Sequence, residues 1–386
     1  MKAVSVDDLI WFGRNLDHKG VRYFDYSASG FEFCFTGKKA IADILSDSNK
    51  WKKNNQAVIG VFVKEIKNGK SFKGDSFWEV DGEEPAQRIL LNKPENQVIL
   101  FESPVEKTVI IKVLKLSEVA FGYAGLKSLK IDGALNKGKS VPEKTNAGSG
   151  KSSSEKKKTS SSFKKLKIEF IGDSITCGYG IEGLYEKDVF KTSQERADKS
   201  YAFLTARKLN AEFNFVSWSG IGLISKYVDE SIEVPDTFIT MPLLWPYTDK
   251  SLSLRLGLEP ELWDESRFSP DIVVINLGTN DASFVRGKED RRLLYVNALR
   301  VFIEQVHARS PKAKICCCLG VMGQDLCKSV KDAVNLFKKD FPGVKIIDVK
   351  LPLQNEEKDG VGTDWHPSYK THKKTADFLV KKLSEL

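Results

Sequence analysis

The chain has 386 residues, of which 41% are hydrophobic and 29% are charged, and its formal net charge is +8. This length allows two domains with separate cores, and no segment approaches the roughly 20 consecutive apolar residues that a membrane-spanning helix needs. Ten lysines and two acids between residues 137 and 167 account for the whole excess of positive charge. The rest of the chain is balanced, so we expect no nucleic-acid-binding surface.

The first third of the chain is rich in short β-type runs separated by turn residues. The runs are Gly30–Thr36, Val58–Val63, Arg88–Leu91, Val98–Phe101 and Thr108–Leu114. No long helical pattern interrupts them. This arrangement predicts an all-β domain, an antiparallel sandwich or jelly roll, over residues 1–133.

Residues 134–165 have a different composition, rich in Ser, Lys and Gly. They hold too little apolar surface to offset the entropy lost on ordering. We therefore predict a flexible linker or surface insertion. Its lysines suit a solvated tether, or alternatively a contact with an anionic surface.

Strand and helix patterns alternate over residues 166–386. Strands are predicted at 166–171, 213–217, 271–277, 313–320 and 344–349, and helices at 200–210, 290–309, 325–340 and 368–385. This alternation predicts a parallel sheet of about five strands with helices on both faces, an α/β domain. Residues 225–268 show no clear strand-helix unit.

Polar residues gather where the predicted strands end. They are Gly172-Asp173-Ser174, Ser217-Trp218-Ser219-Gly220-Ile221-Gly222 and Gly278-Thr279-Asn280-Asp281, with Asp364-Trp365-His366 before the last helix. Ligands bind at the carboxyl edge of an open parallel sheet, so we expect these clusters to converge. A serine at a helix N-terminus needs a base to activate its hydroxyl.

Only one of the four histidines has the setting of a base. His366 lies in a loop, beside an acid and a proline, whereas the others are His18 before the sandwich strands, His307 near a helix C-terminus and His372 in the final helix beside Lys373 and Lys374. Asp173 is expected to hold the Gly-Asp-Ser turn through backbone N–H groups.

The four clusters, in this order, resemble the SGNH (GDSL-type) hydrolases, over about residues 166–386. The longer run Ile171-Gly172-Asp173-Ser174-Ile175-Thr176-Cys177-Gly178-Tyr179-Gly180 is similar to carbohydrate esterase family 2, as is Ser217–Gly222. That family carries a β-sandwich before the hydrolase domain, and here the matching stretches are 30–37 and 120–126. The resemblance implies a jelly-roll sandwich followed by a flavodoxin-like SGNH domain.

The resemblance also implies roles for individual residues. Ser174 is the nucleophile and His366 the base, while the N–H groups of Ser174 and Gly220 and the side-chain amide of Asn280 form the oxyanion hole. Asp364 lies two residues before His366, where most SGNH hydrolases space the acid three residues ahead. In the carbohydrate esterase branch a backbone carbonyl can assist or replace this acid, so both arrangements remain open.

The tryptophans and cysteines are also considered as possible site residues. Trp365, Trp245 and Trp218 are candidates for a sugar-stacking wall, or alternatively packing residues beneath a long insertion. The six cysteines show no metal-ligand spacing, and the run Cys316-Cys317-Cys318 suits a buried strand better than a disulfide framework. We predict no metal and no cofactor.

The sequence therefore predicts a serine esterase that removes O-acetyl groups from a carbohydrate, similar to acetyl xylan esterases. A lipid or acyl-thioester hydrolase of the same fold and a non-catalytic carbohydrate-binding protein are the alternatives. Reduced cysteines and no visible signal peptide favour the cytoplasm, or secretion if the N-terminus is trimmed. The sugar and the oligomeric state are left open.

Overall fold

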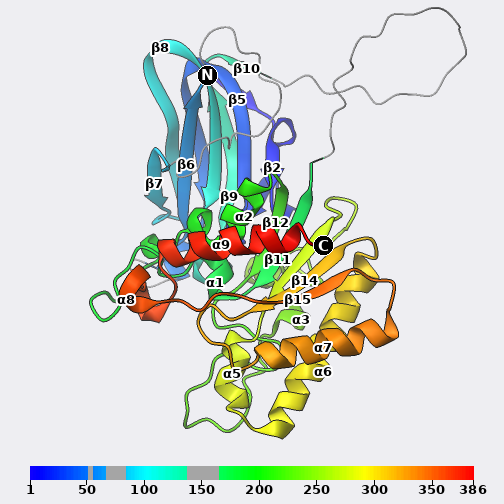
Figure 1. Cartoon of the computed structure of the whole chain (residues 1–386). Coiled ribbons are helices and arrows are strands. Elements are labelled where there is room, and N and C mark those ends of the chain that lie inside the picture. Colours follow the sequence, from blue (N-terminus) through cyan, green and yellow to red (C-terminus); the bar gives the residue numbers. More distant parts are fainter. Residues whose placement is uncertain (51–54, 67–83, 137–164) are drawn as a thin grey trace, which may run out of the picture.

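The computed structural model of the chain describes residues 1–50, 55–66, 84–136 and 165–386. An antiparallel sheet from the N-terminal third stands beside a C-terminal parallel sheet that is layered between helices (Figure 1). The predicted architecture, a jelly-roll-like β domain followed by an α/β domain with five parallel strands, is confirmed. Most of the predicted linker, residues 137–164, lies outside the described residues.

The N-terminal sheet joins its strands in the order β3-β4-β9-β5-β8-β6-β7, with β1 paired to β9, and β2 and β10 paired to β5. The strands are β1 (Lys2–Val4), β2 (Ile10–Phe12), β3 (Asn15–His18), β4 (Val21–Phe24), β5 (Gly30–Leu45), β6 (Val58–Glu65), β7 (Gln87–Leu90), β8 (Glu95–Lys115), β9 (Ala124–Ile131) and β10 (Ala134–Leu135).

Two expectations for this domain were wrong. The runs Val98–Phe101 and Thr108–Leu114 are not separate strands, because both belong to β8, which pairs with β5 from end to end across two register shifts. The predicted linker also begins too early, since Ala134 pairs with Thr36 in the sheet. Long-range pairing to β5 extends both elements through residues whose own composition does not favour a strand.

The two faces of the N-terminal sheet pack against different partners. Phe31, Phe33 and Phe35 point into a core made of β-domain residues alone. Cys34, on the opposite face of β5, lies in a buried cluster that also contains Tyr201 of the α/β domain. Because alternate residues of a strand face opposite sides, one face builds the domain core and the other packs against the α/β domain.

The parallel sheet has the strand order β12-β11-β13-β14-β15, which is the 2-1-3-4-5 order of flavodoxin-like folds. Its strands are β11 (Lys167–Gly172), β12 (Glu212–Ser217), β13 (Ile272–Asn276), β14 (Lys314–Leu319) and β15 (Ile346–Lys350). Its helices are α1 (Ser174–Cys177), α2 (Tyr201–Lys208), α3 (Met241–Leu244), α4 (Lys250–Leu256), α5 (Thr279–Val285), α6 (Glu289–Arg309), α7 (Cys327–Asp340), α8 (Glu356–Asp359) and α9 (Tyr369–Leu383). Short 3₁₀ helices are Val6–Asp8, Ser48–Lys50, Val119–Phe121, Thr192–Gln194, Ala197–Lys199 and Thr363–Trp365. The segment 225–268 thus holds the short helices α3 and α4.

Helices cover both faces of this sheet, with α9 on one side and α6 and α7 on the other (Figure 1). Cys316 and Cys318 of β14 lie in the cluster with Tyr201 of α2 and Leu379 of α9. Cys317 points the other way, into the cluster that includes Phe302 of α6. All six cysteines are free thiols, so the cysteine run serves as small apolar filling for two layers.

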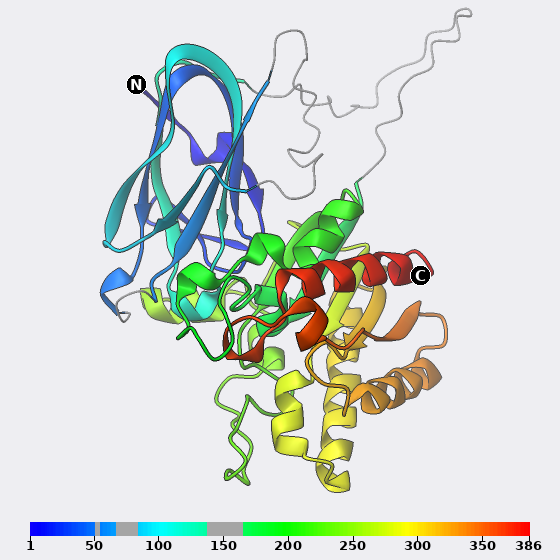
Figure 2. The same cartoon turned by 60° about the vertical axis from the view of Figure 1, so that its left-hand side comes forward.

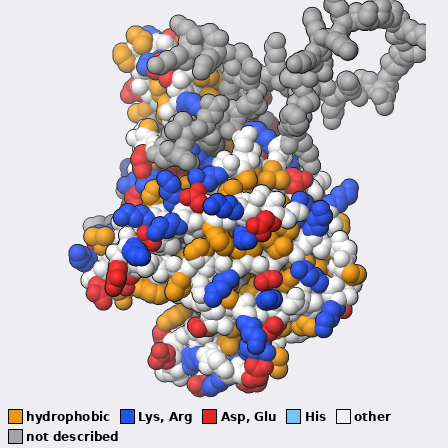
Figure 3. Space-filling view, viewed as in Figure 1, with side chains coloured by type: hydrophobic (Ala, Val, Ile, Leu, Met, Phe, Trp, Pro, Cys, Tyr) orange, Lys and Arg blue, Asp and Glu red, His pale blue; other side chains and the backbone are white. Residues whose placement is uncertain are grey.

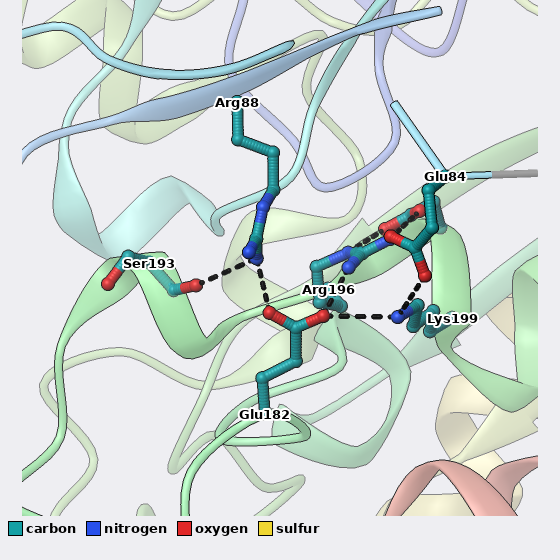
Figure 4. Close-up of polar contacts among 7 residues, drawn as sticks. Glu84, Arg88, Glu182, Ser193, Arg196 and Lys199 are labelled. Carbon is teal, nitrogen blue, oxygen red and sulfur yellow. Dashed lines mark hydrogen bonds and ion pairs between the residues drawn. The ribbon is translucent and has the colours of Figure 1, made fainter. Parts of the chain in front are cut away.

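Charged groups join the two domains at several points. Arg14 of the β domain forms a buried ion pair with Glu169 of β11, at 2.9 Å. Figure 4 shows a second group, in which Arg88 and Glu84 of the β domain contact Glu182, Arg196 and Lys199 of the α/β domain. Figure 2 shows the β domain against one side of the α/β domain, the arrangement that these contacts hold.

The surface carries no block of a single charge on the face seen in Figure 3, where basic and acidic side chains are interspersed over the described residues. Within the described part of the chain, no helix is both long and apolar enough to cross a lipid bilayer.

Candidate active site

Ser174 lies at the turn between β11 and α1. Asp173 caps the helix, because its carboxylate accepts a hydrogen bond from the Ile175 N–H at 3.0 Å, so the expected structural role of Asp173 agrees with its contacts. At Gly172 a Cβ would meet Thr176 Oγ1 at 2.1 Å, which leaves room only for glycine. The turn therefore places Ser174 as the first residue of a helix at the carboxyl edge of the sheet.

His366 meets Ser174 directly. Its Nε2 lies 2.8 Å from Ser174 Oγ, which is the spacing of a nucleophile and its general base. The backbone before it is held in an unusual conformation, with φ of +52° at Asp364 and +60° at Trp365. These left-handed residues turn the chain so that the imidazole faces the serine.

The other ring nitrogen contacts main chain. His366 Nδ1 lies 3.1 Å from the backbone carbonyl oxygen of Asp364. The Asp364 carboxylate instead accepts a hydrogen bond from the Tyr179 hydroxyl at 2.9 Å. The sequence left open whether the carboxylate or the backbone carbonyl of Asp364 contacts the imidazole. In the structure the carbonyl makes this contact, and the carboxylate binds Tyr179.

The imidazole is held neutral. Burial lowers the pKa of His366 to about 4, and the contacts with Asp364 oppose this shift only in part. With Nδ1–H donated to the carbonyl, Nε2 is the free base that faces the serine hydroxyl. The arrangement can take a proton from Ser174 at neutral pH.

Aromatic rings support the histidine from one side. The Tyr179 ring lies 4.4 Å from the His366 ring and stacks at 3.9 Å on Phe190, centroid to centroid. Phe190 in turn contacts Phe121 of the β domain, at 5.2 Å. Tyr179 was not among the predicted site residues, although its place in the Gly-Tyr-Gly run five residues after Ser174 was a usable signal.

Gly220 and Asn280 lie on the loops that follow β12 and β13. The N–H groups of Ser174 and Gly220 donate to no acceptor among the described residues, and open space adjoins the Gly220 Cα. Asn280 Nδ2 donates to the Ile221 carbonyl at 2.8 Å, which ties it to the same loop. The φ of +77° at Gly220 lies in the left-handed region, which favours glycine over residues with a Cβ.

Asp281 is a residue that the sequence reading missed. It is fully buried, and its carboxylate accepts from the N–H groups of Leu223, Ile224 and Ser225 at 2.8–3.3 Å. It therefore fixes the loop that carries Gly220. The acid beside Asn280 in Gly-Thr-Asn-Asp, opposite a glycine-rich turn, was the available signal.

The three candidate tryptophans lie in different settings. Trp365 is 37% exposed beside His366, and Trp218 is half-buried against the core of the α/β domain. Trp245 was wrongly included, because it is only 2% exposed and its Nε1 donates to Glu169 at 3.1 Å inside the domain interface. A buried acid that needs a partner accounts for its position.

Two further residues, His372 and Cys177, are both buried. His372, although it stands beside Lys373 and Lys374 in the sequence, is buried, and its Nδ1 accepts from the Tyr201 N–H at 3.0 Å. Cys177 is buried, and burial raises its thiol pKa well above the usual value, so it stays protonated. The described residues contain no group of three or more metal-ligating side chains close enough to hold an ion.

A cleft of about 630 Å³ lies between β2 and the region of β12, lined by Trp11, Phe12, Phe213 and Trp263 among others. Neither Ser174 nor His366 lines it. Both Trp11 and Trp263 have an arginine against the ring, Arg22 at 5.2 Å and Arg267 at 4.8 Å. The cleft is thus separate from the Ser174 site, and its aromatic rings already have partners.

Comparison with known proteins gives a consistent result. The GDSL-like lipase/acylhydrolase family matches residues 170–374. The cellulase/esterase CelE of Acetivibrio thermocellus is 40% identical over 222 residues, and an acetylxylan esterase / glucomannan deacetylase of Cellvibrio japonicus is 27% identical over 231 residues. The matches cover 56% and 60% of this chain but only 25% and 55% of those two proteins.

Solved structures extend the likeness to both domains. A family two carbohydrate esterase from Clostridium thermocellum, solved with cellohexaose, has a TM-score of 0.74 and 29% identity, with 98% of each chain covered. The acetyl xylan esterase Est2A of Butyrivibrio proteoclasticus has a TM-score of 0.77 over 99% of this chain and 96% of its own; at 22% identity it supports the fold alone. The resemblance seen in the sequence is confirmed.

Proposed function

Because the chain belongs to the GDSL-like lipase/acylhydrolase family, we propose that it is a serine esterase that removes O-acetyl groups from a carbohydrate. The observation that carries the proposal is the 2.8 Å contact between His366 Nε2 and Ser174 Oγ. The names of its relatives, acetylxylan esterase and family two carbohydrate esterase, support acetylated polysaccharide as the substrate class.

The first half of the reaction forms an acyl-enzyme. His366 Nε2 takes the proton of Ser174 Oγ as that oxygen attacks the acetyl carbonyl, and the carbonyl oxygen becomes an oxyanion. The N–H groups of Ser174 and Gly220, with the second amide hydrogen of Asn280, stabilise this charge. The imidazolium then protonates the sugar oxygen, the C–O bond breaks, and the sugar hydroxyl leaves.

The second half releases acetate. Water enters where the sugar left, His366 takes one of its protons, and the resulting hydroxide attacks the acyl carbonyl through a second oxyanion. The proton returns to Ser174 Oγ, the acyl-oxygen bond breaks, and the enzyme is restored. The Asp364 carbonyl accepts the Nδ1 hydrogen throughout, and so it holds one tautomer and orientation of the imidazole.

The experiment that tests this function compares hydrolysis of p-nitrophenyl acetate by the protein and by its Ser174→Ala variant. Turnover that disappears in the variant supports a Ser174 acyl-enzyme, whereas equal rates reject it. A panel of acetylated mono- and oligosaccharides, with the product position read by NMR, then identifies the sugar.

The same assays separate the alternatives. A preference for acetyl over octanoyl esters supports a deacetylase, and the reverse preference supports a lipid hydrolase. Binding of acetylated oligosaccharides without any turnover would indicate a carbohydrate-binding protein instead.

A further inference from the structure

A segment of the β domain enters the α/β domain directly behind the candidate site. It follows β8, and the carbonyl of Leu116 accepts from the Ala197 N–H at 3.1 Å. Two residues later, Glu118 Oε2 accepts from the Ser219 N–H at 2.6 Å and lies 3.7 Å from Cys177 Sγ. Ser219 immediately precedes Gly220, and Cys177 belongs to the helix that begins at Ser174. One carboxylate oxygen therefore contacts both the loop that carries Gly220 and the helix that begins at Ser174.

Glu118 faces a second buried acid. Its own N–H donates to Glu195 Oε2 at 3.0 Å, and both side chains are fully buried. The other oxygens, Oε1 of Glu118 and Oε1 of Glu195, have no hydrogen-bond partner within the part of the chain that the structure describes. Two carboxyl groups thus lie together in the interior, each with one oxygen left without a hydrogen bond.

Burial disfavours the charged form of both acids. Burial raises the pKa of Glu195 well above its usual value, and the charge of Glu118 raises it further. Burial also raises the pKa of Glu118, and the contact with Ser219 and the charge of Lys115 oppose this shift only in part. Glu118 Oε2 accepts the Ser219 N–H at 2.6 Å whichever of the two acids carries a proton.

We propose that Glu118 is a positioning residue for the oxyanion hole, supplied by the β domain to the α/β domain; this rests on the esterase function proposed above. Within the described ranges, the Ser219 N–H is bound only through Glu118, while the nearby N–H groups of Trp218 and Ile221 donate to backbone carbonyls at 3.3 Å. The next N–H along the chain is that of Gly220. Loss of the acceptor leaves a donor unpaired and releases the peptide that aims the Gly220 N–H at the developing oxyanion.

The test measures kcat and KM for p-nitrophenyl acetate in Glu118→Met, which keeps the length of the side chain but has no acceptor oxygen. Active sites are counted by the p-nitrophenol released on reaction with a p-nitrophenyl phosphonate, so rates refer to folded sites. We expect kcat per site to fall about 10- to 100-fold with KM within about twofold of wild type, less than the loss of a whole oxyanion donor. Glu118→Gln, whose amide oxygen can accept the Ser219 N–H, is expected to restore kcat to within about threefold.

Two further variants complete the design. Glu118→Asp keeps the charge but withdraws the acceptor by one methylene, and it covers the case in which Glu118→Met does not fold; we expect about a fivefold lower kcat per site. Glu169→Gln weakens another buried acid of the domain interface, the partner of Arg14, and is expected to lower Tm without changing kcat per site. If Glu118→Met and Glu118→Asp lower only Tm and leave kcat per site unchanged, the proposal is overturned. Wild-type turnover that survives Ser174→Ala would reject the esterase function instead, which keeps the two failures distinct.

Discussion

The Nδ1 atom of His366 lies 3.1 Å from the main-chain carbonyl oxygen of Asp364, while the carboxylate of the same aspartate binds the hydroxyl of Tyr179. The residue that looks like the acid of a catalytic triad therefore offers its backbone to the histidine. A carbonyl oxygen can fix the tautomer of the imidazole, but it carries no full charge to stabilise the imidazolium. The site is a Ser-His pair oriented by the main chain.

This geometry predicts a small effect of Asp364→Asn. Asparagine keeps the carbonyl, tolerates the φ of +52°, and still offers an oxygen to the Tyr179 hydroxyl. We expect kcat to stay within about fivefold of wild type, whereas a true triad acid changed to Asn costs about 10⁴-fold. Steady-state kinetics beside Ser174→Ala provides the measurement, and a loss of a thousandfold or more would show that the carboxylate itself acts on His366.

The low pKa of His366 predicts an unusual pH profile. The base works only when neutral, and burial lowers its pKa to about 4, against about 6.5 for an ordinary histidine. The neutral fraction of His366 therefore rises with pH through about 4, so this group by itself leaves kcat/KM nearly constant from about pH 5 upward. Measurement of kcat/KM between pH 3.5 and 8 on an acetyl ester tests this; an acid limb centred between 6 and 7 that Asp281→Asn leaves in place would contradict it.

Asp281 is expected to matter for both stability and catalysis. Its buried carboxylate accepts three backbone N–H groups of the loop after Gly220, and burial raises its pKa to about 6. Asp281→Asn puts an NH₂ group where Oδ2 accepts from the Leu223 N–H at 3.0 Å and removes the charge that the three N–H groups stabilise, so we expect the free energy of unfolding to fall by about 1–3 kcal/mol and kcat to fall with it. Urea denaturation at pH 7.5 measures the first quantity, with the exposed Asp325→Asn as a control that should change neither. An unchanged urea midpoint for Asp281→Asn would mean that the loop after Gly220 does not depend on the Asp281 carboxylate for its stability.

The sequence carried the information for elements whose signals are local. The alternation after residue 166 specified the parallel sheet, because buried strands and amphipathic helices have different periods. The Ser174 and His366 clusters were recognisable because each joins unusual residues within a few positions, and the structure brings them to 2.8 Å of one another. Such signals survive folding because neighbouring residues remain neighbours.

Features that depend on partners far away in the sequence could not be predicted from the sequence. For Trp245 the sequence left open a sugar-stacking wall or a packing role, and only the contact with Glu169, 76 residues away, explains its buried indole N–H. Asp364 has the composition of a catalytic acid, but left-handed φ values at Asp364 and Trp365 turn its carbonyl toward the imidazole. Glu118 lies in a β-domain segment with no motif, and only the packing of two domains places it behind Ser219. Each depends on pairings or dihedral angles that composition does not encode.

The charged group that joins the two domains predicts unequal losses from two arginines (Figure 4). The Arg196 side chain is completely buried and binds Asp198 through two hydrogen bonds at 2.9 and 2.7 Å, besides Glu182 and Glu84. Arg88 binds the same Glu182 but is 41% exposed. Arg196→Gln leaves the buried Asp198 without its counter-charge, and we expect a loss of about 3–5 kcal/mol in the free energy of unfolding.

For Arg88→Gln the expected loss is about 0–1 kcal/mol, because an exposed ion pair exchanges its partner for water. Urea denaturation of both variants and of wild type, monitored by tryptophan fluorescence, gives the free energy of unfolding of each. The two arginines belong to the same charged cluster, so the comparison isolates the effect of burial. Raising the salt concentration should narrow the gap between Arg88→Gln and wild type, since screening acts on exposed charges, and should leave the Arg196→Gln deficit in place. Equal losses in the two variants would show that burial does not set the strength of this interface.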